Sequence, residues 1–178
     1  MANKWKFRLS GTGGQGVIKA AVVLAESALL DGQNASQSQV YGPESRGSAT
    51  RAEVQISDHE IRFPKVIAPN VLLCLSQQAY DKFIDDLQPG GTLIVDDHVE
   101  LKSAHDDITV HVHPIVNLTR DKLGSELAVN IVALGVMNQI TQAVSDTAME
   151  ESLHRNFKPT AAAWNIEAYY VGKESIIE

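Results

Sequence analysis

The stretch "RLSGTGGQGV" (residues 8–17) decides the fold, because it joins an alternating apolar segment to a long apolar helix pattern. Gly11, Gly13 and Gly16 have the G-x-G-x-x-G spacing, in which glycines let backbone amides approach a phosphate at the start of a helix. A strand, a glycine turn and a helix together are typical of a dinucleotide site. The first hypothesis is therefore an NAD- or FAD-binding oxidoreductase; a tight turn that only packs on its neighbours is the alternative.

The segments beside this turn predict a parallel α/β unit. Residues 4–10 alternate apolar and charged side chains, which predicts a strand with one face inward. Apolar residues recur at helical spacing over 15–30, which predicts a helix that Asp31 and Gly32 end. A dinucleotide site also needs a carboxylate after the second strand, and the short strand expected over 35–40 has none. The missing carboxylate weakens the dinucleotide hypothesis.

Further along, strand and helix patterns alternate. Residues 50–57 alternate strictly and predict an antiparallel hairpin with residues 61–63, and the apolar run at 70–76 predicts a strand covered on both faces. A helix over 77–87, a type II turn around Pro89 and Gly90, and strands at 92–97 and 108–114 follow. From Asn117 onward the pattern is helical. We predict a single α/β domain over residues 1–178: a mostly parallel sheet with helices on both faces, an antiparallel hairpin and a helical C-terminal third.

Composition narrows the class of protein. The net charge of −7 argues against nucleic acid or an anionic membrane surface as a partner, since both reward clustered positive charge. The longest apolar runs are too short to cross a bilayer, and residues 1–10 lack a signal-peptide apolar region, so a cytoplasmic protein is expected. Cys74, the only cysteine, is expected to be a small buried residue. One cysteine can form no internal disulfide and cannot supply the ligands of an iron–sulfur cluster.

A metal site has weak support. His111 and His113 lie two residues apart on an expected strand, and Asp96, Asp97 and His98 follow another strand. Such histidine spacing is common by chance, so surface or loop positions are the preferred interpretation and no metal site is predicted. Serine, histidine and aspartate residues are too scattered to propose a catalytic triad.

Four separated motifs carry a family resemblance. "GTGGQGV" (11–17), "YGPESRGSATRAEVQISDHEI" (41–61), "PNVLLCLSQQAYDKF" (69–83) and "NIVALG" (130–135) occur in an order that resembles the gamma subunit, or gamma domain, of the 2-oxoacid:ferredoxin oxidoreductases. The resemblance covers about residues 7–171, and "YGPESRG" is most similar to the 2-oxoglutarate and pyruvate branches. The sequence departs from the family at Ser48, where a second glycine is common; serine resists a left-handed backbone.

The resemblance implies a subunit without its own catalytic residues. Thiamine diphosphate, Mg²⁺ and iron–sulfur clusters would lie on alpha, beta and ferredoxin-like delta subunits, with coenzyme A as co-substrate and ferredoxin as indirect electron acceptor. The chain alone would be inactive, and a homodimer of the isolated chain stays open. A ligand-free assembly module is a further alternative.

The same resemblance, with the chemistry of the loops, gives a set of candidate binding residues. Glycine amides at a helix start attract phosphates, Gln15 offers a donor and an acceptor, and Arg46 can pair with phosphate or carboxylate. If the first two strands are neighbours, both loops meet at one sheet edge, where open α/β sheets bind ligands. The alternatives are that Arg46 only ties down its own loop through Glu44 and that Tyr41 only packs. The predicted set is Gly11, Gly13, Gly14, Gln15, Gly16, Tyr41, Glu44, Ser45, Arg46 and Gly47.

Overall fold

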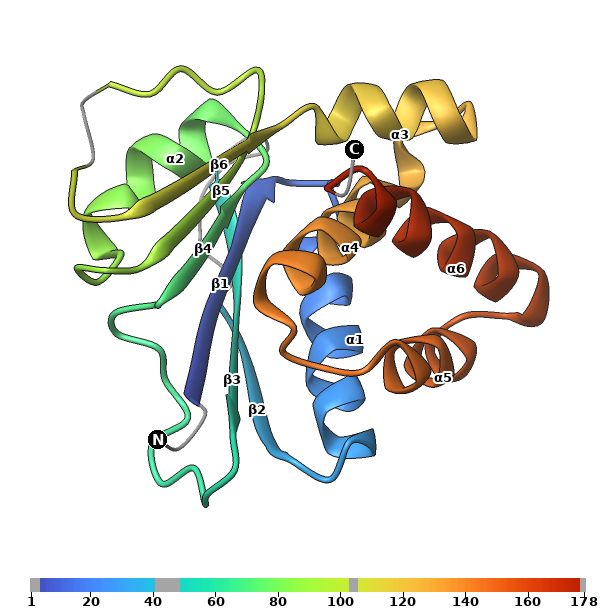
Figure 1. Ribbon diagram of the computed structural model, residues 1–178, viewed down its shortest axis with the longest axis horizontal. Helices are drawn as coiled ribbons and strands as arrows, with labels where there is room; N and C mark the ends of the chain where they lie inside the picture. The colour runs from blue at the N-terminus through green and yellow to red at the C-terminus, as the bar shows by residue number, and fades with distance from the viewer. Residues whose placement is uncertain (1–3, 41–48, 103–105, 177–178) are drawn as a thin grey trace.

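Six strands form one sheet in the computed structural model, which describes residues 4–40, 49–102 and 106–176. The strand order is β2-β3-β1-β4-β5-β6, and β1, β4, β5 and β6 are parallel neighbours (Figure 1). β3 runs antiparallel to both β1 and β2. The strands are β1 (Lys4–Thr12), β2 (Asn34–Val40), β3 (Ala49–Ser57), β4 (Val71–Cys74), β5 (Thr92–Asp96) and β6 (Thr109–His113).

Helices cover both faces of the sheet, as the sequence predicts. α2 packs on one face, while α1, α4, α5 and α6 lie on the other, and α3 leads from β6 toward α4 (Figure 1). The helices are α1 (Val17–Leu30), α2 (Gln77–Phe83), the 3₁₀ turn η1 (Ile84–Asp86), α3 (Ile115–Leu123), the 3₁₀ turn η2 (Glu126–Ala128), α4 (Val129–Thr141), α5 (Asp146–Asn156) and α6 (Pro159–Glu174).

Several local predictions are confirmed. α1 ends at the Asp31–Gly32 turn, where Gly32 has a φ of 77° and the Gln33 amide donates to the Ala28 carbonyl at 2.9 Å. Gly90 has a φ of 75°, and the Gly91 amide donates to the Gln88 carbonyl at 3.0 Å, as a type II turn requires. None of the described helices is long and apolar enough to cross a bilayer.

The predicted hairpin between residues 50–57 and 61–63 is wrong. β3 pairs with β2 on one side and with β1 on the other, and residues 61–63 are in no strand. The segment after β3 instead lies against this strand without pairing with it: Gln55 donates through Nε2 to the carbonyls of Phe63 at 2.7 Å and Lys65 at 3.2 Å. The antiparallel partner of β3 is therefore the strand that precedes it.

The expected one-sided burial of β1 is also wrong. β1 is a central strand, and α2 covers the face that was predicted to be polar, so Arg8 and Ser10 are buried together with Phe7 and Leu9. Arg8 lies opposite Glu53 of β3, and its Nη2 is 2.9 Å from the Glu53 carboxylate. The cross-strand ion pair with this carboxylate offsets the free-energy cost of removing the Arg8 guanidinium from water.

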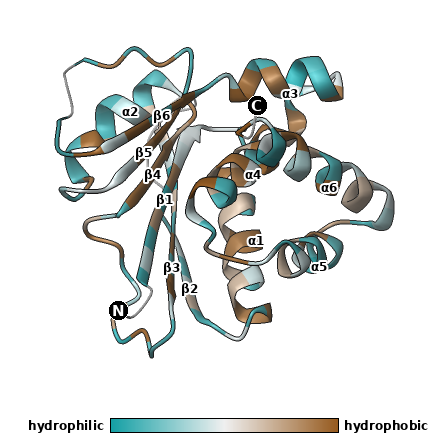
Figure 2. Ribbon diagram, viewed as in Figure 1, coloured by the Kyte–Doolittle hydropathy of each residue, from teal (hydrophilic) through white to brown (hydrophobic). Residues whose placement is uncertain are grey.

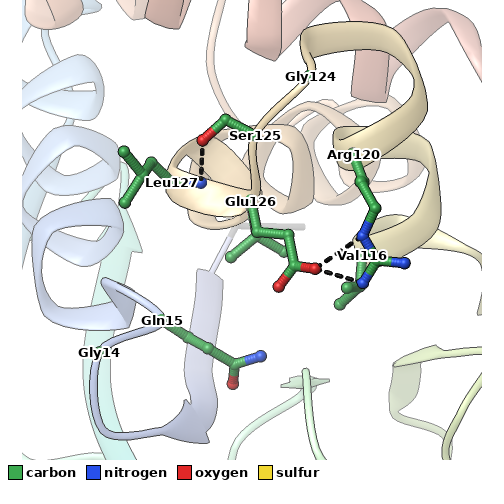
Figure 3. A pocket seen from close by; sticks show the side chains of 9 residues that line it. Gly14, Gln15, Val116, Arg120, Gly124, Ser125, Glu126 and Leu127 are labelled. Atoms are coloured by element: carbon green, nitrogen blue, oxygen red, sulfur yellow. Dashed lines mark hydrogen bonds and ion pairs between the residues drawn. The ribbon is translucent and has the colours of Figure 1, made fainter.

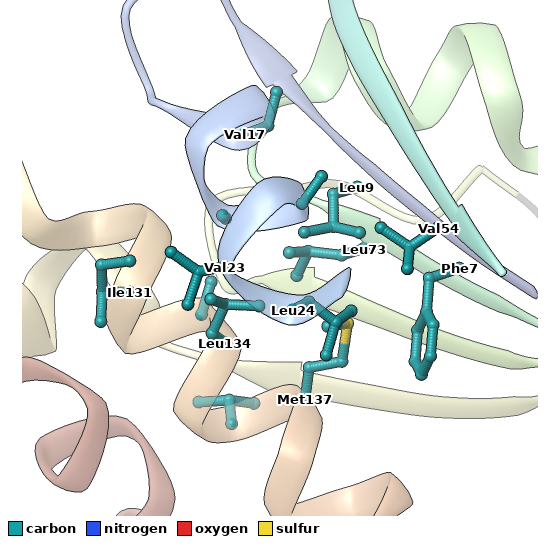
Figure 4. Close-up of a cluster of buried hydrophobic side chains, with 14 of the residues drawn as sticks. Phe7, Leu9, Val17, Val23, Leu24, Val54, Leu73, Ile131, Leu134 and Met137 are labelled. Atoms are coloured by element: carbon teal, nitrogen blue, oxygen red, sulfur yellow. The ribbon is translucent and has the colours of Figure 1, made fainter. Parts of the chain in front are cut away.

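The main hydrophobic core lies between the sheet and the layer of α1 and α4 (Figure 4). Leu24 of α1 and Met137 of α4 face Phe7, Leu9 and Val54 of the sheet in this core. Hydropathy follows the layers, since α1 and α4 carry more hydrophobic residues than the outer helix α5 (Figure 2). Burying each large aliphatic side chain stabilises the fold by about 1.5–3 kcal/mol.

A smaller core lies under α2. Its residues include Tyr80 and Phe83 of α2 and Cys74 of β4. Cys74 is fully buried, and burial raises the pKa of its thiol to about 12, so the predicted inert, buried cysteine is confirmed.

α4 and α6 approach each other through two glycines. A Cβ on Gly135 would overlap the Tyr169 carbonyl oxygen and lie 2.8 Å from the Lys173 amide nitrogen. A Cβ on Gly172 would overlap the Val132 carbonyl oxygen in the same way. This backbone contact fixes α6 against α4, and α4 in turn contacts the glycine turn through Asn130.

Candidate functional site

The glycine turn leaves the end of β1 and leads directly into α1. Gly14 and Gly16 have φ values of 97° and 72°, a left-handed backbone that favours glycine. Gly16 caps α1 without a side-chain hydrogen bond, and Gly13 and Gly14 are exposed. The backbone of the turn is therefore open to solvent at its centre.

Gln15 holds the turn in place from inside. Its Oε1 accepts a hydrogen bond from the Thr12 amide at 2.7 Å, and its Nε2 donates to the Leu75 carbonyl, just after β4, at 3.2 Å. A Cβ on Gly11 would collide with the Gln15 side chain. The donor and the acceptor predicted for ligand contact are thus both used by the protein itself.

Asn130 ties the other end of the turn to α4. Its Nδ2 donates to the Gly16 carbonyl at 3.0 Å, and a Cβ on Gly16 would lie 2.8 Å from that nitrogen. Asn130 is buried and begins the "NIVALG" motif. Gly16 thus needs to be glycine for two reasons, its backbone conformation and the nearness of Asn130.

A pocket of about 520 Å³ opens between the glycine turn and the segment from α3 to α4 (Figure 3). Arg120 of α3 faces it and pairs with Glu126, with 2.9 Å between Arg120 Nε and Glu126 Oε1. Leu127 is 85% exposed at the rim. Hydrogen bonding to Glu126 raises the pKa of Arg120, so this guanidinium stays charged. The lining residues are Gly14, Gln15, Val116, Arg120, Gly124, Ser125, Glu126, Leu127 and Val129.

The far wall of this pocket is fixed to the end of β5. Asp96 is buried; one carboxylate oxygen accepts from the Val116 amide of α3 at 2.8 Å, and the other is 2.6 Å from Nδ1 of His98. This hydrogen bond to Asp96 raises the pKa of His98. The glycine turn that follows β1 and the helix α3 that Asp96 ties to the end of β5 thus place this pocket at the carboxyl edge of the parallel strands, where open α/β sheets bind ligands.

The weak metal candidates are partly brought together. Asp96, Asp97 and His98 offer ligand atoms within 4.8 Å of one another, but Asp96 already holds α3 and His98. His111 and His113 stack on each other with ring centroids 6.2 Å apart. These hydrogen bonds and ring contacts explain the cluster, and we assign it no metal.

The second predicted loop lies outside the described residues. Tyr41, Glu44, Ser45, Arg46 and Gly47 therefore stay a prediction, as does the consequence of Ser48. The premise that the first two strands are neighbours is wrong, since β3 lies between them. β1 and β2 nevertheless point the same way, because both are antiparallel to β3, and Ala49 at the start of β3 pairs with Thr12. The described end of that loop therefore begins beside the glycine turn.

This topology also disfavours the dinucleotide alternative. In a dinucleotide site the strand next to β1 is parallel and ends in the ribose-binding carboxylate. Here the neighbour on that side is the antiparallel β3, which starts at this edge rather than ending there.

Comparison with known proteins decides between the remaining interpretations. Residues 6–175 match the family described as pyruvate ferredoxin/flavodoxin oxidoreductase. The chain belongs to this family. The resemblance drawn from the four motifs is confirmed, and the NAD- or FAD-binding alternative finds no support among the relatives.

Relatives of this family cover nearly the whole chain. The 2-oxoglutarate synthase subunit KorC of Methanocaldococcus jannaschii is 41% identical over 95% of this chain and 92% of its own length. The crystal structure of a keto/oxoacid ferredoxin oxidoreductase gamma subunit from Geobacter sulfurreducens is 37% identical, with a TM-score of 0.88, covering 98% of this chain and 97% of that one. The predicted α/β fold is confirmed by this match.

A solved structure of lower sequence identity has the same fold within a longer chain. The 2-oxoglutarate:ferredoxin oxidoreductase of Magnetococcus marinus, solved with 2-oxoglutarate, coenzyme A and succinyl-CoA bound, aligns with a TM-score of 0.84 at 20% identity. The alignment covers 96% of this chain but only 30% of that protein. In that protein the fold seen here is one part of a larger polypeptide.

Sequence reasoning missed several residues of the pocket. Arg120, Glu126 and Leu127 stand in no motif, and they reach the glycine turn only because α3 follows the last strand. Asn130 had a signal, since it lies in one of the four motifs, but its contact with Gly16 spans 114 positions.

Proposed function

We propose that the chain is the gamma subunit of a 2-oxoacid:ferredoxin oxidoreductase whose substrate is 2-oxoglutarate. The observation that carries this proposal is the 41% identity to a 2-oxoglutarate synthase subunit over almost the full length of both chains. The pyruvate synthase subunit PorC of Methanothermobacter thermautotrophicus is 26% identical over a similar length, which favours 2-oxoglutarate over pyruvate.

The reacting groups are assigned to partner subunits. Thiamine diphosphate and Mg²⁺ would supply the decarboxylation chemistry there, and iron–sulfur clusters would carry electrons toward ferredoxin. This chain offers a single thiol, on Cys74, and burial holds that thiol protonated, whereas a cluster is bound by several thiolates. The partners in this proposal are alpha, beta and ferredoxin-like delta subunits, and a cytoplasmic complex fits a chain without a disulfide.

The glycine turn is proposed to face coenzyme A. No atom of the described residues lies within 4 Å of the position that a Cβ would take on Gly13 or Gly14, which supports close approach of an anionic group to this backbone. The φ of Gly13 lies outside the left-handed region, which means that its own backbone does not require glycine. A glycine that neither packing nor conformation demands supports a site for an incoming ligand.

Two cationic side chains extend this proposal. Arg120 faces the same pocket as Gly14 and can pair with a phosphate when Glu126 releases it. Arg46 and its neighbours Tyr41, Glu44, Ser45 and Gly47 are assigned to the same site from the sequence, since Ala49, which follows that loop, pairs with Thr12. The role of this surface is to hold and orient coenzyme A for a reaction on partner subunits.

Reconstitution tests the proposed substrate. The chain is co-expressed with alpha, beta and delta subunits, and ferredoxin reduction is measured with 2-oxoglutarate and with pyruvate. We expect kcat/KM to favour 2-oxoglutarate by at least about tenfold and the isolated chain to be inactive. Preference for pyruvate would overturn the substrate assignment, and turnover by the isolated chain would overturn the assignment of the reacting groups to partners.

A further inference from the structure

A second pocket, of about 400 Å³, opens on the α2 face of the sheet. It lies over β3. Residues 65–67, which contact this strand through Gln55, form one of its sides. Its charged groups come from four separate segments: β1, β3, residues 65–67 and η1. They are Arg8, Arg51, Glu53, Lys65 and Asp86.

Arg8 forms ion pairs with both carboxylates of this pocket, those of Glu53 and Asp86. The arginine is 2% exposed; its Nε and Nη2 donate to Glu53 Oε1 at 3.1 and 2.9 Å, and its Nη1 pairs with Asp86. The other Glu53 oxygen accepts from the Val66 amide at 3.3 Å. Neither carboxylate is therefore left without a partner, and the buried charge of Arg8 is balanced.

Arg51 has one printed anionic neighbour among the described residues, Glu53, and it shares that carboxylate with Arg8. Its Nε lies 3.7 Å from Glu53 Oε1, beyond hydrogen-bond range, and that oxygen already accepts twice from Arg8. This Nε is buried and makes no hydrogen bond. The guanidinium instead stacks over the Phe83 ring, with its carbon 5.4 Å from the ring centroid, so a cation–π contact positions it.

The charges do not cancel. Among the described lining residues, three cations, Arg8, Arg51 and Lys65, face two carboxylates, which leaves one positive charge in a chain whose net charge is −7. The neighbouring wall is apolar, because Val66 and Ile67 also line the pocket, and Ile67 is 76% exposed. One positive charge beside an exposed apolar side chain matches an anion of single charge with a short carbon chain.

We propose that this pocket binds a small monocarboxylate, with the carboxylate on Arg51 and Lys65 and the carbon chain against Val66 and Ile67. The planar guanidinium presents two parallel donors to a carboxylate, and Phe83 fixes its plane beforehand. Inorganic phosphate, with nearly two negative charges and no apolar part, fits this balance less well. The proposal concerns the chain by itself and goes beyond its role in the oxidoreductase.

Titration of the isolated full-length chain tests this site. Backbone amide spectra are recorded with butyrate, with 1-butanol as the uncharged analogue and with inorganic phosphate. We expect butyrate to shift the Arg51, Val66 and Ile67 amides saturably, with a Kd on the order of 1–10 mM, and butanol and phosphate to bind at least about tenfold more weakly. No saturable shift with butyrate, shifts confined to other regions, or tighter binding of phosphate would overturn the proposal.

Charge-removing variants locate the binding group. Arg51→Gln should weaken butyrate binding by about tenfold and Lys65→Gln by about threefold, since each removes one charge-assisted contact. Arg62→Gln is the matched control, because Arg62 is 89% exposed and does not line the pocket. Equal affinities in Arg51→Gln and the control would contradict the proposal. If Arg51→Gln does not fold, the Lys65→Gln result and the wild-type shift map still decide it.

Discussion

Gly11 and Gly16, at the ends of the turn after β1, are packed against side chains, whereas no described residue packs against the Cβ positions of Gly13 and Gly14 between them. Gly11 leaves room for the side chain of Gln15, and Gly16 leaves room for Asn130. At Gly13 and Gly14, by contrast, no side chain or backbone of the described residues occupies the space next to the glycine. One glycine motif thus meets two different demands: packing requires glycine at its ends, and we propose that its centre serves a ligand.

The difference extends to glycines elsewhere in the chain. Gly135 and Gly172 belong with the packed group, since a methyl group on either would meet backbone of the facing helix. A flexible side chain can move aside, but the backbone of a packed helix cannot, so these glycines should tolerate substitution least. Alanine substitutions at packed and open positions therefore form a graded test.

The largest effect is expected for Gly135→Ala. Its Cβ would overlap the Tyr169 carbonyl and force α6 away from α4, so we expect the free energy of unfolding to fall by about 3 kcal/mol or more. Urea denaturation followed by circular dichroism measures this loss. Gly13→Ala is the matched control, because it adds the same methyl group where no described residue would contact it. Equal stability of the two variants would contradict the packed-glycine account.

Gly16→Ala should come next. A left-handed backbone costs a non-glycine residue about 1–2 kcal/mol, and the new methyl group would also displace the Asn130 amide. A double-mutant cycle with Asn130→Ala separates the two costs, since only the displacement is shared. We expect the double variant to lose less stability than the sum of the single variants. Strict additivity would mean that backbone conformation alone explains the effect.

Gln15 provides an intermediate test. Gln15→Ala removes the hydrogen bonds to the Thr12 amide and the Leu75 carbonyl, and should lower the free energy of unfolding by about 1–2 kcal/mol. Gln15→Glu keeps the acceptor but places an oxygen against the Leu75 carbonyl, so it should not restore stability. Full stability in Gln15→Glu would show that the contact with Leu75 contributes nothing.

Gly13→Ala should have the smallest effect on stability. Its φ lies outside the left-handed region and no described residue lies near the new methyl group, so we expect a change within about 0.5 kcal/mol. Thermal melting of the purified chain measures it. A loss comparable to that of Gly16→Ala would erase the distinction between the ends and the centre of the turn.

The parts of the fold that follow a local period could be predicted from the sequence. The apolar spacing of α1 and the glycines before it specify a strand, a turn and a helix, and the continuous apolar run of β4 indicates a strand buried on both faces. These patterns reflect contacts that each element makes with the core as a whole, so they do not depend on which neighbour it has.

Strand partners and buried charges could not be predicted in the same way. The alternation of β3 is compatible with any antiparallel neighbour, and nothing in residues 50–57 indicates that β2 rather than residues 61–63 supplies it. Arg8 alternates with apolar residues like any solvent-facing charge, and only the presence of Glu53 and α2 makes it a buried residue. Such features depend on contacts between distant parts of the chain.

Only part of the candidate site could be predicted from the sequence. The glycine turn is a local motif and was found, whereas Arg120, Glu126 and Leu127 reach it from more than a hundred positions away. No spacing rule links these residues to the turn. Their place in the pocket depends on the anchoring of α3 by Asp96 at the end of β5.

The most direct test of the account is the KM for coenzyme A of the assembled oxidoreductase carrying Gly13→Ala. We expect the KM for coenzyme A to rise by about tenfold, while the KM for 2-oxoglutarate and the melting temperature of the isolated chain stay unchanged, because the methyl group would occupy space left open for the ligand. An unchanged KM for coenzyme A in a fully assembled variant would contradict the claim that the centre of the turn serves this ligand.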